Sequence, residues 1–331
     1  MERSIMNYLS ELMGLTGKAE GNILLEGISF PKDRKLTVNL LALGDVGGSL
    51  LTGLRLLGGS VVAEIGIYDL NPEVMMRYEQ EMNQIAWPFD YDALPTVRIL
   101  KEEELFQGDV FLFCASKGVP PVKTKPENVD VRMAQYEANK PLVEHYARMA
   151  YRQGFKGLFA VISDPVDPLC KAALMASGLE PRQIRGYGLG VMNSRAAYYA
   201  RKDRRFFRFL REGRVFGPHG NDLVVADSVA NYDHELSMEL TRLTVESNLR
   251  VRELGFKPYI APAFSSGALS VLCTLQGKWH YSSFYFGDGS KGAFLGAKNR
   301  LIDGITEVEN LPLPPQLFHR IGCAYGNLCR L

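Results

Sequence analysis

The first half of the chain alternates short apolar runs with amphipathic helical patterns. Four runs have the length and continuity of strands that are buried on both faces of a parallel sheet: residues 38–43, 62–68, 110–114 and 158–162. Helical patterns lie between them, at residues 49–57, 73–84 and 129–153. Strands that alternate with helices in this way predict an α/β fold built on a doubly wound parallel sheet, the Rossmann arrangement.

The pattern changes near Leu179 and divides the chain into segments. Strand-like alternation joined by glycine-rich turns fills residues 279–331, after helical patterns at residues 194–209, 234–254 and 265–276. We therefore predict an N-terminal extension over 1–36, a cofactor-binding domain over 37–178 and a C-terminal α+β substrate domain over 179–331. The extension is expected either to pack on a neighbouring subunit or to fray.

One apolar run leads into a glycine-containing turn, ALGDVGG, at residues 42–48. A helical pattern follows, and the next apolar run ends in Asp69, 25 residues after Gly44. This is the layout of a βαβ unit that binds a dinucleotide. Gly44 and Gly47 let the backbone approach a diphosphate, and the helix N-terminus offers unpaired N–H groups to it. The predicted cofactor contacts in the turn are Gly44, Asp45, Val46 and Gly47.

Asp69 predicts which dinucleotide binds. A carboxylate at this position accepts hydrogen bonds from the adenine-side ribose and repels a 2′-phosphate, so NAD is favoured over NADP. Two features weaken the fingerprint. Ala42 stands where the first glycine is usual, and Asp45 places a negative charge in the phosphate turn unless it caps local N–H groups. An ordinary turn between strand and helix, without a nucleotide, is the alternative.

Composition narrows the classes of protein that fit. The chain has 331 residues, 46 % of them apolar, a formal net charge of +1 and five scattered cysteines. No apolar run approaches the roughly 20 residues of a membrane helix. The first residues lack a secretory signal, and no Cys/His metal spacing occurs. We expect a reduced cytoplasmic protein with no metal site and no membrane association.

A basic segment at residues 201–214 is the densest charge cluster, with seven Lys and Arg in fourteen positions. We interpret it as a solvated helix face with Phe206, Phe207 and Leu210 turned inward. Nucleic-acid binding is disfavoured because no recognised nucleic-acid module accompanies the segment.

His219 is the first candidate for chemistry. It lies between Gly-Pro and Gly-Asn in GPHGND, residues 217–222, a sequence that predicts a tight turn. Histidine is the side chain best suited to proton transfer near neutral pH. A single histidine of this kind is more often structural or simply exposed, so the surrounding motifs decide the interpretation.

Together with the glycine turn, this block resembles the lactate/malate dehydrogenase family over about residues 37–308. Further blocks resemble the family in the same order: CASKGVP at 114–120, ENVDVRMAQYEANKPLV at 127–143, ISDPVDPL at 162–169, GYGLGVMNSRAAYY at 186–199, SSGAL at 265–269 and AFLGAKNRLIDGITEV at 293–308. The resemblance implies hydride transfer between NAD and a 2-hydroxy or 2-keto acid, in a homodimer or homotetramer.

The resemblance also implies roles for individual residues. His219 is the proton donor or acceptor, and Arg132, on a closing loop, polarises the substrate oxygen. Asn139 lies near the nicotinamide ribose, and Ala115 belongs to the turn that crosses the nicotinamide side. Ser265 faces the substrate.

Three positions depart from the family pattern. Asn193 stands at the expected position of the acid that orients the histidine, and Asp164 stands at that of an asparagine. We interpret this as an exchange in which Asp164 becomes the carboxylate partner of His219 and Asn193 stays nearby. The arginine that binds the substrate carboxylate is expected at Ala196. Its neighbour Arg195 would reach the site only through a local distortion, because it lies about 100° around the helix.

These departures leave alternatives open. The leading hypothesis is an NAD-dependent oxidoreductase with an altered choice of small-molecule substrate, such as a larger or less anionic 2-hydroxy acid. A non-catalytic nucleotide-binding or structural member with a degenerate site is the alternative. Sugar redox or NAD-assisted glycoside chemistry is a third reading, disfavoured because it usually needs a metal site.

Overall fold

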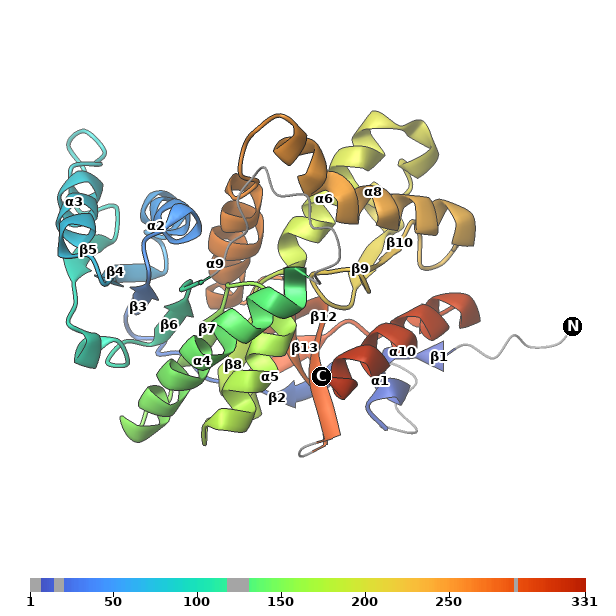
Figure 1. The fold of residues 1–331 in the computed structure, drawn as a ribbon, viewed down its shortest axis with the longest axis horizontal. Helices are drawn as coiled ribbons and strands as arrows, with labels where there is room; N and C mark the ends of the chain where they lie inside the picture. The colour runs from blue at the N-terminus through green and yellow to red at the C-terminus, as the bar shows by residue number, and fades with distance from the viewer. Residues whose placement is uncertain (1–6, 15–20, 118–130, 289–290) are drawn as a thin grey trace, which may run out of the picture.

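Six parallel strands form one half of a continuous sheet, as the computed structural model shows for residues 7–14, 21–117, 131–288 and 291–331 (Figure 1). The strands are β3 (Leu36–Leu41), β4 (Val62–Tyr68), β5 (Thr96–Ile99), β6 (Val110–Phe113), β7 (Leu158–Val161) and β8 (Ile184–Gly186). Their order across the sheet is β8-β7-β6-β3-β4-β5, and the direction of winding reverses between β3 and β6. The predicted doubly wound sheet is confirmed.

Four antiparallel strands continue the same sheet beyond β8: β11 (His280–Asp288), β12 (Lys291–Ile302), β13 (Ile305–Val308) and β2 (Ile23–Glu26). The parallel part extends past the predicted boundary at residue 178, because β8 still belongs to it.

Two short antiparallel pairs lie outside this sheet: β9 (Arg214–Phe216) with β10 (Val224–Ala226), and β1 (Asn7–Tyr8) with β14 (Pro312–Leu313). In the described part of the predicted extension, β1 pairs with β14, β2 pairs with β13, and Leu9 is buried. These residues therefore pack on their own chain.

Helices cover both faces of the parallel strands. One face carries α2 (Asp45–Leu57), α3 (Pro72–Asn83), the π-helix η4 (Pro262–Ala268) and α9 (Leu269–Leu275). The other face carries α4 (Val131–Arg152) and α5 (Val166–Ala176). The remaining helices are α1 (Leu9–Leu12), α6 (Leu189–Lys202), α7 (Phe209–Glu212), α8 (His234–Glu253), α10 (Pro315–Arg330) and the 3-10 turns η1 (Glu102–Glu104), η2 (Pro181–Gln183) and η3 (Arg204–Phe206).

Strand β6 shows why the apolar runs are continuous. Val110 and Leu112 belong to the cluster that Leu50 of α2 joins, while Phe111 and Phe113 belong to the cluster on the opposite face. Because successive side chains of a strand point to opposite faces, a strand covered on both sides needs apolar residues at nearly every position. The parallel sheet is therefore the centre of a three-layer core.

The basic segment at residues 201–214 largely follows the prediction. Phe206 is buried at 1 % exposure and Leu210 is half-buried, but Phe207 is 55 % exposed, so its predicted inward direction is wrong. No helix in the described ranges combines the length and the apolar character that crossing a membrane requires.

Candidate active site

The candidate site lies where several strands of the sheet end. The glycine turn follows β3, Asp69 follows β4, Ala115 follows β6 and Asp164 follows β7. Carboxyl ends of parallel strands meet at one edge of a sheet, and ligands of doubly wound folds bind there. His219 comes from the second half of the chain, in the turn between β9 and β10.

The ring of His219 is held by a carboxylate. Its Nδ1 lies 2.8 Å from Oδ1 of Asp164, within the range expected from the sequence. The His219 side chain is 11 % exposed, whereas half of the Asp164 side chain is exposed. Burial opposes the charge on Asp164, but the neighbouring charges of His219, Arg132 and Arg195 outweigh it and lower the pKa of this carboxyl.

A second carboxylate, Asp167, lies beneath the histidine turn. It is 2 % exposed in the first turn of α5, accepts a hydrogen bond of 3.0 Å from the backbone N–H of His219, and accepts another from the Ser283 hydroxyl. Burial raises its pKa to about 6. Sequence reasoning missed this residue. Its only signal was an acid three positions after Asp164, at the start of an otherwise apolar helix.

Arg195 faces Asp164 without any distortion of α6. Its charge acts on the pKa of Asp164, and burial lowers the pKa of the arginine itself. Among the described residues, its one hydrogen-bonding contact is the Met192 sulfur, 3.6 Å from Nη1. A half-buried guanidinium without an oxygen acceptor is prepared to bind an anion. Ala196, by contrast, is fully buried in an apolar cluster.

Asn193 is not the residue that holds the His219 ring. It lines a pocket of about 230 Å³ together with Ser265 and Trp279, and no hydrogen bond joins it to His219 within the described ranges. The residue three positions before Arg195 is Met192, so the predicted correspondence along α6 was shifted by one residue. Ser265 lines the same pocket, and its position facing the substrate stays a prediction. Aligning the helix on Arg195 would have avoided the shift.

Arg132, in the first turn of α4, reaches the histidine turn. Its Nη1 donates a hydrogen bond of 3.2 Å to the backbone carbonyl of His219. The guanidinium passes so close to Gly220 that a Cβ at that position would lie 1.7 Å from Nη1. Residues 118–130, which precede Arg132 and include most of the expected closing loop, lie outside the described ranges.

Asn139 connects two segments of the candidate site. It is fully buried, and its Oδ1 accepts a hydrogen bond from the backbone N–H of Lys117 at 2.6 Å. Its Nδ2 donates to the Ser116 hydroxyl at 3.2 Å and to the Asp164 carbonyl at 2.7 Å. Both N–H groups of the amide are used, so Asn139 has a structural role, and its position near the nicotinamide ribose stays a prediction. Asn139 ties the turn after Ala115 to Asp164.

The glycine turn has the geometry of a phosphate-binding turn. Ala42 adopts a left-handed φ of +74°, and a Cβ on Gly47 would lie 1.9 Å from the Ala42 carbonyl oxygen. A Cβ on Gly44 would meet nothing within 4 Å. No side chain caps the first turn of α2. Its N–H groups can therefore donate hydrogen bonds to a phosphate oxygen. The half-buried Val46 packs against the core beneath the turn.

The two acids of this region have separate partners. Asp69 accepts hydrogen bonds from the backbone N–H groups of Leu43, at 2.7 Å, and Asn71, at 2.9 Å. Its carboxylate therefore lies directly beside the glycine turn. Asp45 forms an ion pair with Lys257 at 2.8 Å. The turn and Asp69 thus fit the diphosphate and ribose of a dinucleotide.

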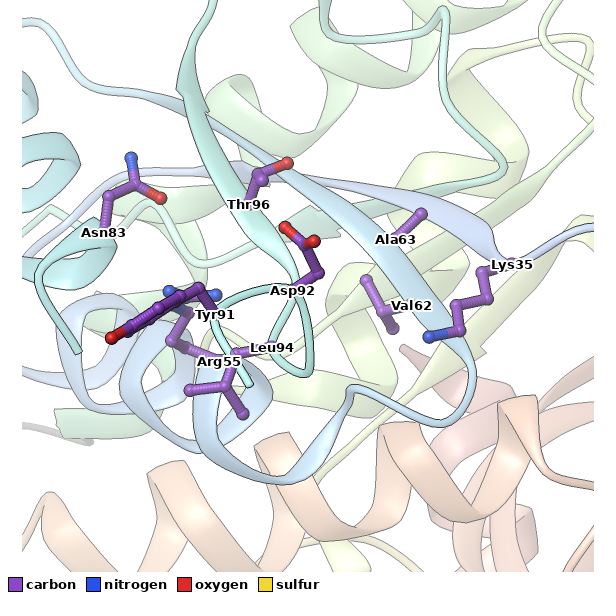
Figure 2. A pocket seen from close by; sticks show the side chains of 9 residues that line it. All are labelled: Lys35, Arg55, Val62, Ala63, Asn83, Tyr91, Asp92, Leu94 and Thr96. Atoms are coloured by element: carbon purple, nitrogen blue, oxygen red, sulfur yellow. The ribbon is translucent and has the colours of Figure 1, made fainter. Parts of the chain in front are cut away.

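A pocket of about 500 Å³ opens away from these residues, beside the first residues of β4 and β5 (Figure 2). Val62 and Thr96 line it together with Arg55, which is 3 % exposed. Arg55 donates hydrogen bonds to the carbonyls of Met82, at 2.9 Å, and Ile85, at 2.7 Å, and so fastens the end of α3 to α2. This arginine is structural, and none of the predicted site residues lines the pocket.

Comparisons with known proteins agree with this geometry. No family model matches the chain. The L-lactate dehydrogenase of Mesomycoplasma hyopneumoniae strain 232 is 24 % identical over 226 residues, which cover 67 % of this chain and 68 % of that protein. The solved structure of a minor L-lactate dehydrogenase from Enterococcus mundtii superposes with a TM-score of 0.72 at 20 % identity, covering 89 % of this chain and 96 % of that one. A malate dehydrogenase from Archaeoglobus fulgidus in complex with NADH gives 0.70 at 17 % identity, covering 88 % and 97 %.

The fold is that of the lactate and malate dehydrogenases, a Rossmann sheet continued by an antiparallel second half. In sequence, the chain is similar to the L-lactate dehydrogenases.

The buried carboxylate of Asp167 gives stability a specific pH dependence. An ordinary aspartate has a pKa near 3.9, so a folded-state value of about 6 means that ionisation opposes folding. The contribution of Asp167 to the free energy of unfolding is most favourable below about pH 4, and it is lost as the pH rises through about 6. Between pH 4.5 and 7.5, wild type should lose about 2 kcal/mol of unfolding free energy relative to Asp167→Asn. Denaturant unfolding of both proteins at these pH values measures the difference, and parallel pH profiles would contradict it.

Proposed function

We propose that the protein is an NAD-dependent oxidoreductase that interconverts a 2-hydroxy acid and the corresponding 2-keto acid. The observation that carries the proposal is the His219–Asp164 pair, 2.8 Å apart, beside the Arg195 guanidinium. A histidine with a carboxylate partner can take up a proton, and a guanidinium without an oxygen acceptor can bind a carboxylate. An acid–base group and an anion site are the two parts that this reaction requires from the protein.

The cofactor proposal depends on the glycine turn. Gly44 leaves open space at the N-terminus of α2, and Asp69 lies beside the turn with its carboxylate toward Leu43. The turn would hold the diphosphate, and Asp69 would accept hydrogen bonds from the ribose hydroxyls. When bound, the nicotinamide accepts or supplies the hydride. The NADH complex of the Archaeoglobus fulgidus malate dehydrogenase, which has the same fold, supports the proposal.

His219 would exchange the proton of the substrate hydroxyl. Its Nδ1 is engaged by Asp164, and Nε2 has no hydrogen-bond partner among the described residues, so Nε2 is the nitrogen that is free to meet the substrate. Asp164 holds the ring in one orientation and stabilises the imidazolium that forms on alcohol oxidation. Asp167 fixes the backbone of the turn, and Arg132, which donates to the His219 carbonyl, would polarise the substrate oxygen.

The charges of the site favour an altered substrate. Arg195 would bind the carboxylate of the substrate in two-point contact. The exposed half of Asp164 adds a negative charge where the family resemblance places a neutral amide. A second carboxylate on the substrate would be repelled there, so a less anionic 2-hydroxy acid is favoured over a dicarboxylate. The homodimer or homotetramer and the cytoplasmic location stay predictions.

Asp69 should determine which cofactor binds. We expect NADH to bind at least about tenfold more tightly than NADPH, because the 2′-phosphate would meet a carboxylate. Asp69→Asn keeps an oxygen that accepts from the Leu43 N–H but removes the negative charge. The substitution should therefore reduce the difference in affinity between NADH and NADPH. Fluorescence titrations of both proteins with both cofactors measure it. Equal affinity of wild type for NADH and NADPH would remove Asp69 from the ribose site.

His219 should be necessary for turnover. NADH oxidation is to be measured with a series of 2-keto acids that differ in side-chain length and charge. For any acid that wild type reduces, His219→Ala should lower kcat at least about hundredfold, the usual contribution of a positioned acid–base group. The affinity for NADH should stay unchanged in the same variant. Undiminished turnover in His219→Ala would contradict the proposed mechanism.

A further inference from the structure

An ion pair joins the glycine turn to the second half of the chain. The Lys257 ammonium lies 2.8 Å from Oδ2 of Asp45, the first residue of α2, across 212 positions of sequence. Lys257 comes from the segment between α8 and η4. The hydrogen bond and the charge of Asp45 raise the pKa of this lysine, so it stays protonated at neutral pH. Both side chains are about half exposed and are accessible to a ligand.

The negative charge of Asp45 opposes the binding of a diphosphate at the glycine turn. An acid in the first turn of a helix is favourable in the free protein, because it meets the positive end of the helix dipole. A bound diphosphate needs the same place and would be repelled by the carboxylate. Asp45 makes no capping hydrogen bond to the first N–H groups of α2, and its carboxylate is directed to Lys257 instead. The lysine therefore neutralises the one acid of the turn.

We propose that Lys257 is a cofactor-binding residue that neutralises Asp45 and donates a hydrogen bond to the diphosphate of the dinucleotide. The inference rests on the proposed binding of NAD. An ammonium group carries three N–H donors, and Asp45 is the single partner of Lys257 among the described residues. Donors therefore remain for a phosphate oxygen beside the first turn of α2.

The segment that carries Lys257 is anchored against α2. A Cβ on Gly53 of α2 would lie 2.5 Å from Ala268 and 3.1 Å from Phe264, so η4 packs on this helix at backbone distance. A Cβ on Gly267 of η4 would likewise lie 2.9 Å from the Leu50 side chain of α2. Figure 1 shows α9, which continues η4, beside α2. Lys257 lies five residues before η4 begins, and this packing holds its backbone near the turn.

The experiment is a fluorescence titration of the full chain with NADH. Lys257→Met should weaken NADH binding at least about tenfold, since it removes a charge-assisted hydrogen bond and leaves Asp45 without a counter-ion. Lys257→Arg keeps the charge and should stay within about threefold of wild type. Lys156→Met is the matched control, because it removes an exposed lysine from the loop before β7 and should leave the affinity unchanged. Thermal unfolding of each variant shows that it is folded.

The same lysine substitution, made in an Asp45→Asn protein, tests whether Lys257 acts by neutralising Asp45. In Asp45→Asn, the loss caused by Lys257→Met should be smaller than in wild type, because no carboxylate is left to repel the diphosphate. The salt dependence of NADH binding should also be weaker in Lys257→Met than in wild type.

The outcomes separate the two claims. Wild-type affinity in Lys257→Met, a loss in Lys257→Arg as large as in Lys257→Met, or an equal loss in both Asp45 backgrounds would overturn the role of Lys257 while leaving the proposed function intact. Failure of wild type to bind NADH would overturn the proposed function and this inference together.

Discussion

A histidine that takes up a proton from its substrate needs a nearby group that stabilises the new positive charge. We propose that in this chain the group is Asp164, at the end of β7, with its carboxylate 2.8 Å from Nδ1 of His219. The family resemblance expects this acid on the helix that here is α6, where the structure has the buried Met192. In the proposed mechanism the charge therefore lies at the end of a strand instead of on a helix. The chemistry proposed for the site depends on this one hydrogen bond.

The surrounding structure holds both ends of that bond. Asn139 donates to the Asp164 carbonyl and fixes the backbone on one side. Asp167 accepts from the His219 N–H, and Arg132 donates to the His219 carbonyl on the other side. These groups come from α4, α5 and the β9–β10 turn, so the site exists only when both halves of the chain are folded together. The continuous sheet, which runs from the parallel strands through β8 into β11, provides that connection.

The sequence predicted the parallel sheet well because strands covered on both faces must be apolar at nearly every position. It missed β8, whose residue Arg185 is only 3 % exposed. That guanidinium is buried because distant residues supply its partners: the hydroxyls of Ser282, at 3.0 Å, and Thr306, at 2.8 Å. No local pattern indicates such a strand.

The site was predictable to the extent that it depends on single motifs. The pairing of Asp164 with His219 followed from two short blocks, ISDPVDPL and GPHGND. The arginine was expected at Ala196 rather than Arg195, a shift of one residue along α6, which turns a side chain by about 100° and moves it to another face. The pair between Asp45 and Lys257 spans most of the chain and has no signal in either segment alone.

The central claim is that Asp164 has taken over the role of the missing acid. The most direct measurement compares kcat of Asp164→Asn and Asn193→Ala with the best 2-keto acid and saturating NADH. The account predicts that Asp164→Asn lowers kcat at least about hundredfold, while NADH binding is unchanged and Asn193→Ala stays close to wild type. Turnover in Asp164→Asn equal to that of wild type, or a larger loss in Asn193→Ala, would contradict it.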